Sequence, residues 1–322
     1  MAAPYPEQAS RRNDWIVSRR SGRNSLDAQR PSAFLLEKER THSGEIATIA
    51  TVFLTNRECP WRCLMCDLWK NTLEETVPPQ AIPNQINFAL KELSLQGSAL
   101  QIKLYNSGSF FDPNAVPIQD YPAIAQRLLG FERVIVECHP SLIKDSILRF
   151  RDLLKGQLEI AMGLETVCPD VLEKLNKRMS LEDFARAAAF LKSNDIALRA
   201  FILVRPPFMT EDEGIHWAKQ SLNFAFDCGA SVASLIPTRL GNGALEALME
   251  QGQFAEPKLS SLETALTYGL DLKLGRVFAD TWDLERFSDC QKCFPARAQR
   301  LERMNLEQFA LPKVKCSACG EV

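Results

Sequence analysis

The sequence lacks any apolar run of about 18 residues, the length that a membrane-spanning helix needs. Its first residues lack the apolar core of a secretory signal, so the pair Arg11-Arg12 does not indicate export. Internal repeats and low-complexity segments are also missing. The net charge is only −2, which gives the whole chain no pull toward nucleic acid or membranes. These absences predict a cytoplasmic protein with no membrane segment.

What the sequence does contain is cysteine. Ten cysteines in a chain without a secretory signal predict metal or cluster ligation rather than disulfides. The 322 residues suffice for one large α/β domain and a small appendage.

Strand-like apolar runs alternate with helical patterns from about residue 44. Strands are expected at 45–54, 99–105, 132–138, 157–164, 196–204 and 230–236. Helices are expected near 84–96, 120–129, 141–155, 169–192, 211–228 and 258–273. This order predicts an α/β fold with a parallel sheet, in the form of an open, partial (β/α)6 barrel. The functional site should lie at the carboxyl ends of the strands.

Changes in composition divide the chain into three segments. Residues 1–42 are polar and arginine-rich, which predicts an extension that is draped on the domain or partly disordered, or alternatively a basic arm for an anionic substrate. Residues 43–274 form the expected barrel. Residues 275–322 are short polar pieces with two CxxC pairs, which predicts a separate small module.

Three cysteines spaced C-x3-C-x2-C are the most informative motif. Cys59, Cys63 and Cys66 lie on one loop after the first expected strand. Three thiolates on a short loop can hold three irons of a [4Fe–4S] cluster and leave the fourth iron open for a substrate. The alternative is a group of packed core thiols that share this spacing by coincidence.

This motif, with its Pro-Trp-Arg insert, resembles that of the radical S-adenosylmethionine (SAM) superfamily. The resemblance implies a [4Fe–4S] cluster whose open iron binds SAM. The cluster would reduce SAM, releasing methionine and a 5′-deoxyadenosyl radical. It also implies an electron donor such as flavodoxin or ferredoxin.

The resemblance extends to two segments that follow the second and third expected strands. Ser107, Gly108 and Ser109 stand where the superfamily has a glycine-rich turn that binds the amino group of SAM. Glu137 ends the third strand and would lie near SAM. An ordinary strand-end turn and a capping or ion-paired glutamate explain the same residues. The nearby His139 is expected to be a hydrogen-bonding loop residue.

The stretch from Gly163 to Lys177 resembles that of the branch containing the Elongator catalytic subunit, MiaB and NifB. Glu165 matches a residue that contacts the ribose and amino-acid part of SAM, and Lys177 matches a basic residue that pairs with its carboxylate. Arginine usually stands at the second position, so Lys177 keeps the charge without the bidentate fork, and Arg178 is a possible substitute. A surface helix end rich in basic residues is the alternative.

Two arginines follow the fifth and sixth expected strands. Arg205 and Arg239 are candidates for binding a phosphate or carboxylate, or else simply solvated charges.

The second strong cysteine signal is at the C-terminus. Cys290 and Cys293 form one CxxC pair, and Cys316 and Cys319 form another. Four such thiolates predict a zinc-ribbon-like site, with an auxiliary iron–sulfur cluster as the alternative.

A more specific resemblance is to the archaeosine-synthase radical SAM subunits, lyases that act on a 7-deazaguanine base of tRNA. It rests on the motif from Cys59 to Trp69, on the segments 106–110 and 280–283, and on the terminal CxxC pairs. It implies a tRNA substrate and a partner tRNA-modifying enzyme. A radical SAM enzyme for a small molecule or peptide, and a non-catalytic zinc and iron–sulfur scaffold, remain as alternatives.

Overall fold

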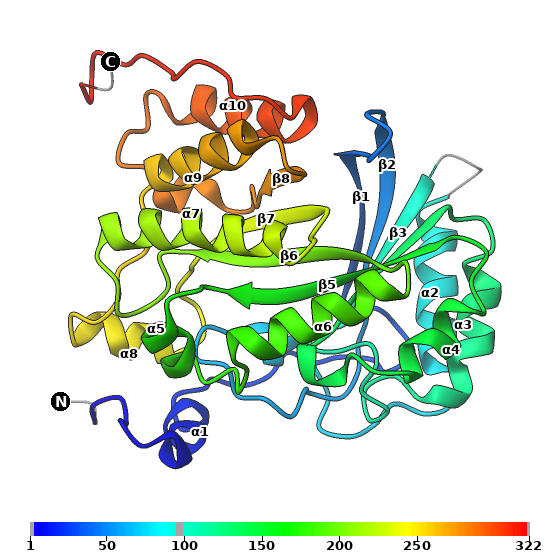
Figure 1. The fold of residues 1–322 in the computed structure, drawn as a ribbon. Coiled ribbons are helices and arrows are strands. Elements are labelled where there is room, and N and C mark those ends of the chain that lie inside the picture. Colours follow the sequence, from blue (N-terminus) through cyan, green and yellow to red (C-terminus); the bar gives the residue numbers. More distant parts are fainter. Residues whose placement is uncertain (1–2, 95–98, 321–322) are drawn as a thin grey trace.

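The computed structural model describes residues 3–94 and 99–320. Its centre is an eight-stranded sheet that curls into a half barrel, with the strands in sequence order (Figure 1). β1 is antiparallel to β2, and every later neighbouring pair is parallel. The strands are β1 (Ala33–Arg40), β2 (Ile46–Phe53), β3 (Ala99–Tyr105), β4 (Arg133–Glu137), β5 (Gln157–Glu165), β6 (Ala197–Val204), β7 (Val232–Pro237) and β8 (Arg276–Ala279). The six expected strands are β2 to β7, and the predicted fold class is confirmed.

Helices cover the outer face of this sheet (Figure 1). The α-helices are α1 (Ala9–Val17), α2 (Ala81–Glu92), α3 (Tyr121–Arg127), α4 (Ser146–Arg151), α5 (Pro169–Lys174), α6 (Leu181–Ser193), α7 (Glu211–Asp227), α8 (Ala244–Glu250), α9 (Leu259–Leu272) and α10 (Phe294–Glu307). Four 3₁₀ helices are η1 (Leu68–Asn71), η2 (Ile118–Asp120), η3 (Pro140–Leu142) and η4 (Leu284–Phe287). The last residues of the helix expected at 84–96 lie outside the described residues.

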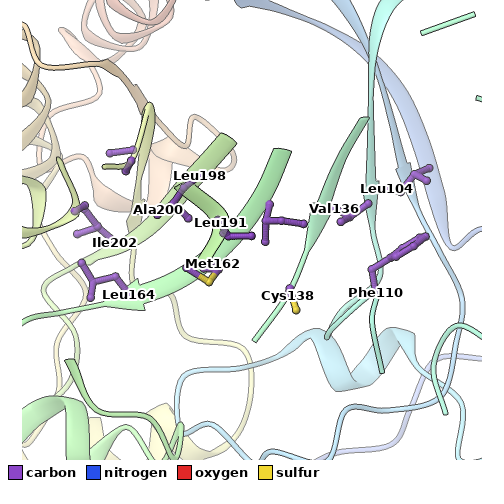
Figure 2. Close-up of a cluster of buried hydrophobic side chains, with 14 of the residues drawn as sticks. Leu104, Phe110, Val136, Cys138, Met162, Leu164, Leu191, Leu198, Ala200 and Ile202 are labelled. Carbon is purple, nitrogen blue, oxygen red and sulfur yellow. The ribbon is translucent and has the colours of Figure 1, made fainter. Parts of the chain in front are cut away.

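The hydrophobic core lies between the sheet and its outer helices. Leu104, Val136, Met162 and Ile202 come from four successive strands of the sheet and are completely buried (Figure 2). Burial of each such side chain stabilises the fold by about 1.5–3 kcal/mol. Cys138 belongs to this core, where burial raises the pKa of its thiol. Cys138 is therefore a packing residue and does not act as a fourth metal ligand beside the three cysteines of the loop.

Paired charges fill part of the sheet between β1 and β6. Glu39 of β1 accepts hydrogen bonds from Lys103 at 2.6 Å and from Arg199 at 2.5 Å, and Arg199 also binds Glu159 at 2.8 Å. Although burial raises it, the charges of Arg199 and Lys103 hold the pKa of Glu39 well below its usual range. A buried charge is tolerated when it is paired in this way. This network explains why the charged segment 33–40 forms a strand.

The N-terminal segment, which the sequence predicted to be draped on the domain or partly disordered, contains the ordered elements α1 and β1. Tyr5, Trp15 and Ile16 are buried against Leu64 of the cysteine loop and Leu245 of α8. Because these aromatic and aliphatic side chains share one cluster, the segment packs on the barrel (Figure 1).

The helix expected over 169–192 is two helices, α5 and α6, separated by residues 175–180. Asn176 and Arg178 adopt left-handed φ angles of 56° and 61°, which no helix tolerates. Ser180 then begins α6 with a reciprocal capping box to Asp183.

No described helix, in residues 3–94 or 99–320, is long and apolar enough to cross a lipid bilayer.

Candidate active site

The loop after β2 carries Cys59, Cys63 and Cys66, and two other loops hold it in place. The backbone N–H of Leu64 donates to the carbonyl of Leu175 at 2.9 Å. The side chain of Asn242, from the loop after β7, donates to the carbonyls of Leu64 at 2.7 Å and Cys66 at 3.4 Å. The shape of the cysteine loop is therefore set by side chains that come from distant parts of the sequence.

A second support comes from the residue before the first cysteine. Glu58 accepts hydrogen bonds from Arg20 at 2.7 Å and Arg23 at 2.5 Å, and it lies 3.1 Å from Arg62. Although burial raises it, the hydrogen bonds from Arg20 and Arg23 lower the pKa of Glu58. The N-terminal segment thus fixes the start of the cysteine loop at Cys59.

All three cysteines of the loop are partly buried. Burial raises the pKa of Cys59 and Cys63, and it raises the pKa of Cys66 to about 12. The charges of Cys59 and Cys66 also raise the pKa of Cys63, and the charge of Cys59 raises that of Cys66. A metal centre binds thiolates, so loading such a loop releases protons. Three partly buried thiols that share one loop fit a cluster with three protein ligands.

The turn after β3 lies directly against this loop. A Cβ atom on Gly108 would stand 2.8 Å from the Cβ of Cys59, closer than two side chains can approach. The preceding Ser107 adopts a left-handed φ of 53°. Glycine is therefore required where the turn meets the first cysteine.

Glu137 holds the same turn from the end of β4. Its carboxylate accepts hydrogen bonds from the backbone N–H of Asn106 at 3.2 Å and of Gly108 at 3.4 Å. Burial raises the pKa of Glu137 to about 7, although these N–H groups oppose the rise. Because the carboxylate takes the N–H groups, the turn can offer a cationic ligand its carbonyl oxygens.

Ser109 and Asn106, in the same turn, differ in whether their side chains are hydrogen-bonded. Ser109 is buried, and its hydroxyl accepts a hydrogen bond from the backbone N–H of His139 at 2.8 Å. Ser109 therefore ties the turn to the next loop. Asn106 is completely buried, and neither polar atom of its amide has a hydrogen-bond partner in the described chain. An unsatisfied buried amide costs about 1–3 kcal/mol, which fits a site that a polar ligand completes.

Trp61 and His139 form a contact that the sequence did not reveal. Their rings stack with centroids 3.9 Å apart and planes 9° apart. His139 Nε2 lies 3.0 Å from the carbonyl of Lys177, so this nitrogen carries the proton, and Nδ1 accepts from the N–H of Ser141. Burial lowers the pKa of His139 to about 4. A neutral histidine thus joins the cysteine loop to the segment that contains Lys177.

Lys177 and Glu165 form a buried ion pair beside the cysteines. Each residue is 7% exposed. Although burial lowers it, the charge of Glu165 raises the pKa of Lys177. Both charges also act on the thiol of Cys63. Gly163 leaves room for the pair, since a Cβ atom there would lie 2.1 Å from Glu165 Oε1 and Lys177 Nζ.

The structure therefore gathers most of the predicted residues in one place. The three cysteines, Gly108, Glu137, Glu165 and Lys177 come from five loops or strand ends at the carboxyl edge of the sheet. This arrangement has the thiols for a cluster, and it has both signs of charge for a zwitterionic ligand.

Comparison with known proteins finds archaeal relatives with similar sequences. The chain is 26% identical over 303 residues to an uncharacterized protein of Methanocaldococcus jannaschii, covering 90% of this chain and 83% of that protein. It is 27% identical over 226 residues to the archaeosine synthase subunit beta of Methanosarcina acetivorans, covering 66% of this chain and 64% of that subunit. No protein-family model matches.

Among solved structures, the chain resembles the archaeal Elp3 of Methanocaldococcus infernus, which was solved with an N-terminal deletion. The TM-score is 0.52 at 13% sequence identity, covering 69% of this chain and 59% of that one. The chain has the radical SAM fold. The predicted likeness to this superfamily is confirmed, and the prediction of an enzyme of this class agrees with the fold.

Two arginines at the rim of this radical SAM fold are engaged within the protein. Arg205 lies 2.5 Å from Glu211, and Arg239 lies 2.7 Å from Asp280. Both were candidates for binding an anion, yet each has a carboxylate partner in the described chain. They are part of the framework of the rim loops.

The four C-terminal cysteines form a compact cluster. Their sulfur atoms all lie within 4.8 Å of one another, with Cys290 and Cys316 4.0 Å apart and Cys293 and Cys319 3.8 Å apart. Backbone N–H groups of Ala318 and Cys319 lower the pKa of Cys316 to about 7. Four thiolates at about 2.3 Å from a tetrahedral zinc ion stand about 3.8 Å apart, which fits this cluster.

Proposed function

We propose that this radical SAM protein binds a [4Fe–4S] cluster through Cys59, Cys63 and Cys66 and cleaves SAM beside it. The observation that carries the proposal is the meeting of three partly buried thiols with the Gly108 turn and the Lys177–Glu165 pair. When bound, the cluster supplies the electron that cleaves SAM to methionine and a 5′-deoxyadenosyl radical. An external donor such as flavodoxin or ferredoxin would provide that electron.

The protein's own residues have distinct tasks in this proposal. The turn of Ser107 and Gly108 presents carbonyl oxygens to the amino group of SAM, and Glu137 keeps the turn in shape through its N–H groups. Lys177 offers its ammonium to the SAM carboxylate, while Glu165 holds that ammonium in place. Ser109 acts indirectly, because its hydroxyl is occupied by His139.

The test is anaerobic reconstitution with iron and sulfide, followed by measurement of 5′-deoxyadenosine with SAM and a reductant. The wild-type protein should bind about four irons at this loop and form 5′-deoxyadenosine. The triple variant C59A/C63A/C66A should lose both. Cys168→Ser is the matched control, because Cys168 is a partly exposed thiol outside the loop. Cleavage of SAM by the triple variant would reject the assignment.

We further propose that the substrate is a base of tRNA, modified in an archaeosine-synthase-like lyase step. This rests on the likeness to the archaeosine synthase subunit beta, of which the chain spans 64%. A partner tRNA-modifying enzyme would then prepare the base, and the reaction would take place in the cytoplasm. Nucleoside analysis of tRNA from a deletion strain tests this step. Loss of one modified nucleoside, restored by the wild-type gene and not by the triple variant, is the expected result.

The C-terminal cysteines are proposed to hold a structural zinc ion. The close spacing of the four sulfur atoms favours one metal ion over an auxiliary cluster, whose thiolates bind separate irons and stand wider apart. β8 completes the sheet, so we place the start of this module after β8 and not at residue 275. Zinc has no redox chemistry and can stabilise a small module beside a one-electron reaction.

A further inference from the structure

Trp282 is the most exposed large hydrophobic side chain in the described part of the chain, with 66% of its surface open to solvent. It lies in the segment that follows β8, two residues after Asp280. A single exposed apolar residue is ordinary on a protein surface. Trp282 differs because its backbone is held firmly while its ring is left free of the core.

Two residues grip the backbone of Trp282. Its N–H donates to Asp280 Oδ1 at 3.0 Å, and its carbonyl accepts from Arg239 Nη2 at 2.8 Å. Arg239 Nη1 in turn donates to the other oxygen of Asp280 at 2.7 Å. The three residues close a ring of charge-assisted hydrogen bonds, which are the stronger kind.

The same arginine is supported from below. Its guanidinium lies 5.6 Å from the ring centroid of Phe287, and Phe287 is buried. Asp283 follows with a left-handed φ of 50°, so the chain turns sharply after the tryptophan. Because the backbone at Trp282 is already ordered, a ligand that covers the side chain costs little additional conformational entropy.

The loop that holds the backbone of Trp282 also contacts the candidate active site. Arg239 lies three residues before Asn242, the residue whose amide donates to the carbonyls of Leu64 and Cys66. One short loop therefore contacts the cysteine loop at one end and fixes Trp282 at the other. Because β8 runs parallel to β7, both ends belong to the carboxyl edge of the sheet.

We propose that Trp282 is a stacking platform for an unpaired base of the RNA substrate, an inference that rests on the proposed function. A nucleobase needs one flat ring, whereas a protein partner needs a wider apolar patch. The neighbours Thr281 and Asp283 are polar, and no other large hydrophobic side chain of residues 275–308 is exposed. Arg239 and Asp280 are already paired, so the platform recognises a ring and not a phosphate.

The experiment compares RNA binding by the full-length protein and three variants. The probe is a fluorescein-labelled tRNA transcript, followed by anisotropy over a series of salt concentrations. Trp282→Ala should weaken binding about ten- to a hundredfold, the range for losing one base–aromatic stack. Trp282→Phe should stay within a few-fold of wild type. The slope of affinity against salt should not change, since no phosphate contact is lost.

Phe309→Ala is the matched control. Phe309 is also an exposed aromatic residue, at 53%, and it follows Gln308, which binds the backbone of Val277 near the start of β8. It therefore lies toward the opposite edge of the sheet and should not affect RNA binding. Equal losses in Trp282→Ala and Phe309→Ala would overturn the platform, as would unchanged binding in Trp282→Ala.

Two further readouts identify other occupants. If Trp282→Ala weakens SAM binding by calorimetry and leaves RNA binding intact, the ring covers the adenine of SAM and the inference is wrong. If the same change converts a dimer to a monomer without affecting RNA binding, the surface joins two copies of the chain. SAM cleavage by the wild-type protein is measured in parallel. Its absence beside normal RNA binding would reject the radical reaction and leave the platform in place.

Discussion

Lys177 is paired with Glu165 although the two residues lie on opposite sides of α5 in the sequence. The contact exists because the chain leaves its helical path after α5, with left-handed backbone at Asn176 and Arg178. A continuous helix over this segment would carry Lys177 away from the end of β5. The break between α5 and α6 is thus what brings a cation to the cysteines.

Replacement of Lys177 by Met should affect both stability and ligand binding. It leaves Glu165 buried without its partner, and breaking such a pair costs about 3–5 kcal/mol. It should also weaken SAM binding by about 1–3 kcal/mol, the range for a charged hydrogen bond. Urea unfolding and calorimetry measure the two effects separately.

The double variant K177M/E165Q separates these roles. It removes the stranded carboxylate, so stability should largely return while SAM affinity stays low. Lys155→Met is the control, because Lys155 is exposed and lies before the amino end of β5, whereas the site is at its carboxyl end. SAM affinity equal to wild type in both Lys177 variants would remove Lys177 from the binding site.

Glu137 should make the stability of the protein depend on pH. Burial raises its pKa from 4.5 to about 7, so the folded state binds a proton more tightly than the unfolded state. The stabilising contribution is therefore complete below about pH 4.5 and is lost as the pH rises through about 7, with a limit of about 3 kcal/mol. Glu137→Gln should remove this contribution, so that the free energy of unfolding changes less with pH between about 4.5 and 7. Parallel pH curves for the two proteins, measured by chemical unfolding, would contradict the assignment.

The C-terminal cysteines should retain metal when the cluster loop cannot. In the C59A/C63A/C66A variant, metal analysis should find about one zinc per chain and little iron. Adding Cys316→Ser should remove that zinc and open the residues after β8 to protease, while Cys228→Ser in its place should change neither. Iron without zinc in the triple variant would mean an auxiliary cluster. Unchanged protease resistance after Cys316→Ser would mean that the four thiols do not form one site.

The parts of the fold that the sequence predicts are those governed by apolar periodicity. β2 to β7 are buried runs such as that of Ile46–Phe53, and their positions follow from this pattern. β1 is different, because Glu37 and Glu39 interrupt its apolar residues. Its backbone pairing with β2 and the ion pairs of Glu39 with Lys103 and Arg199 place it in the sheet, and such long-range contacts leave no local signal.

The candidate site divides in the same way. The cysteine motif is local, so Cys59, Cys63 and Cys66 are visible in the sequence. The contacts of Trp61 with His139 and of Asn242 with the cysteine loop join segments more than 70 residues apart and are invisible before folding. The break before α6 did have a local signal, the capping-box pattern of Ser180 and Asp183, which the apolar periodicity of this stretch obscured.

The N-terminal segment should act as a latch on the loops of the candidate site, and Arg12 is its central residue. Arg12 is only 2% exposed, and its guanidinium donates to Glu173 at 2.6 and 3.0 Å and to the carbonyls of Pro6 and Glu7. Arg12→Ala should destabilise the protein by about 1–3 kcal/mol, because several charge-assisted hydrogen bonds are lost at once.

The effect of Arg12→Ala should be largest near the latch. Amide hydrogen exchange should accelerate in residues 3–20 and around Asn176, whose side chain binds Asn13 at 2.8 Å, while β5 and β6 stay protected. Arg11→Ala is the control, since Arg11 is exposed and its neighbour makes the contacts. If exchange around Asn176 is the same in Arg12→Ala as in Arg11→Ala, the segment packs on the barrel without holding these loops. Faster exchange there together with weaker SAM binding would show that the first twenty residues set the shape of the site. In the sequence these residues are only part of a polar, arginine-rich extension.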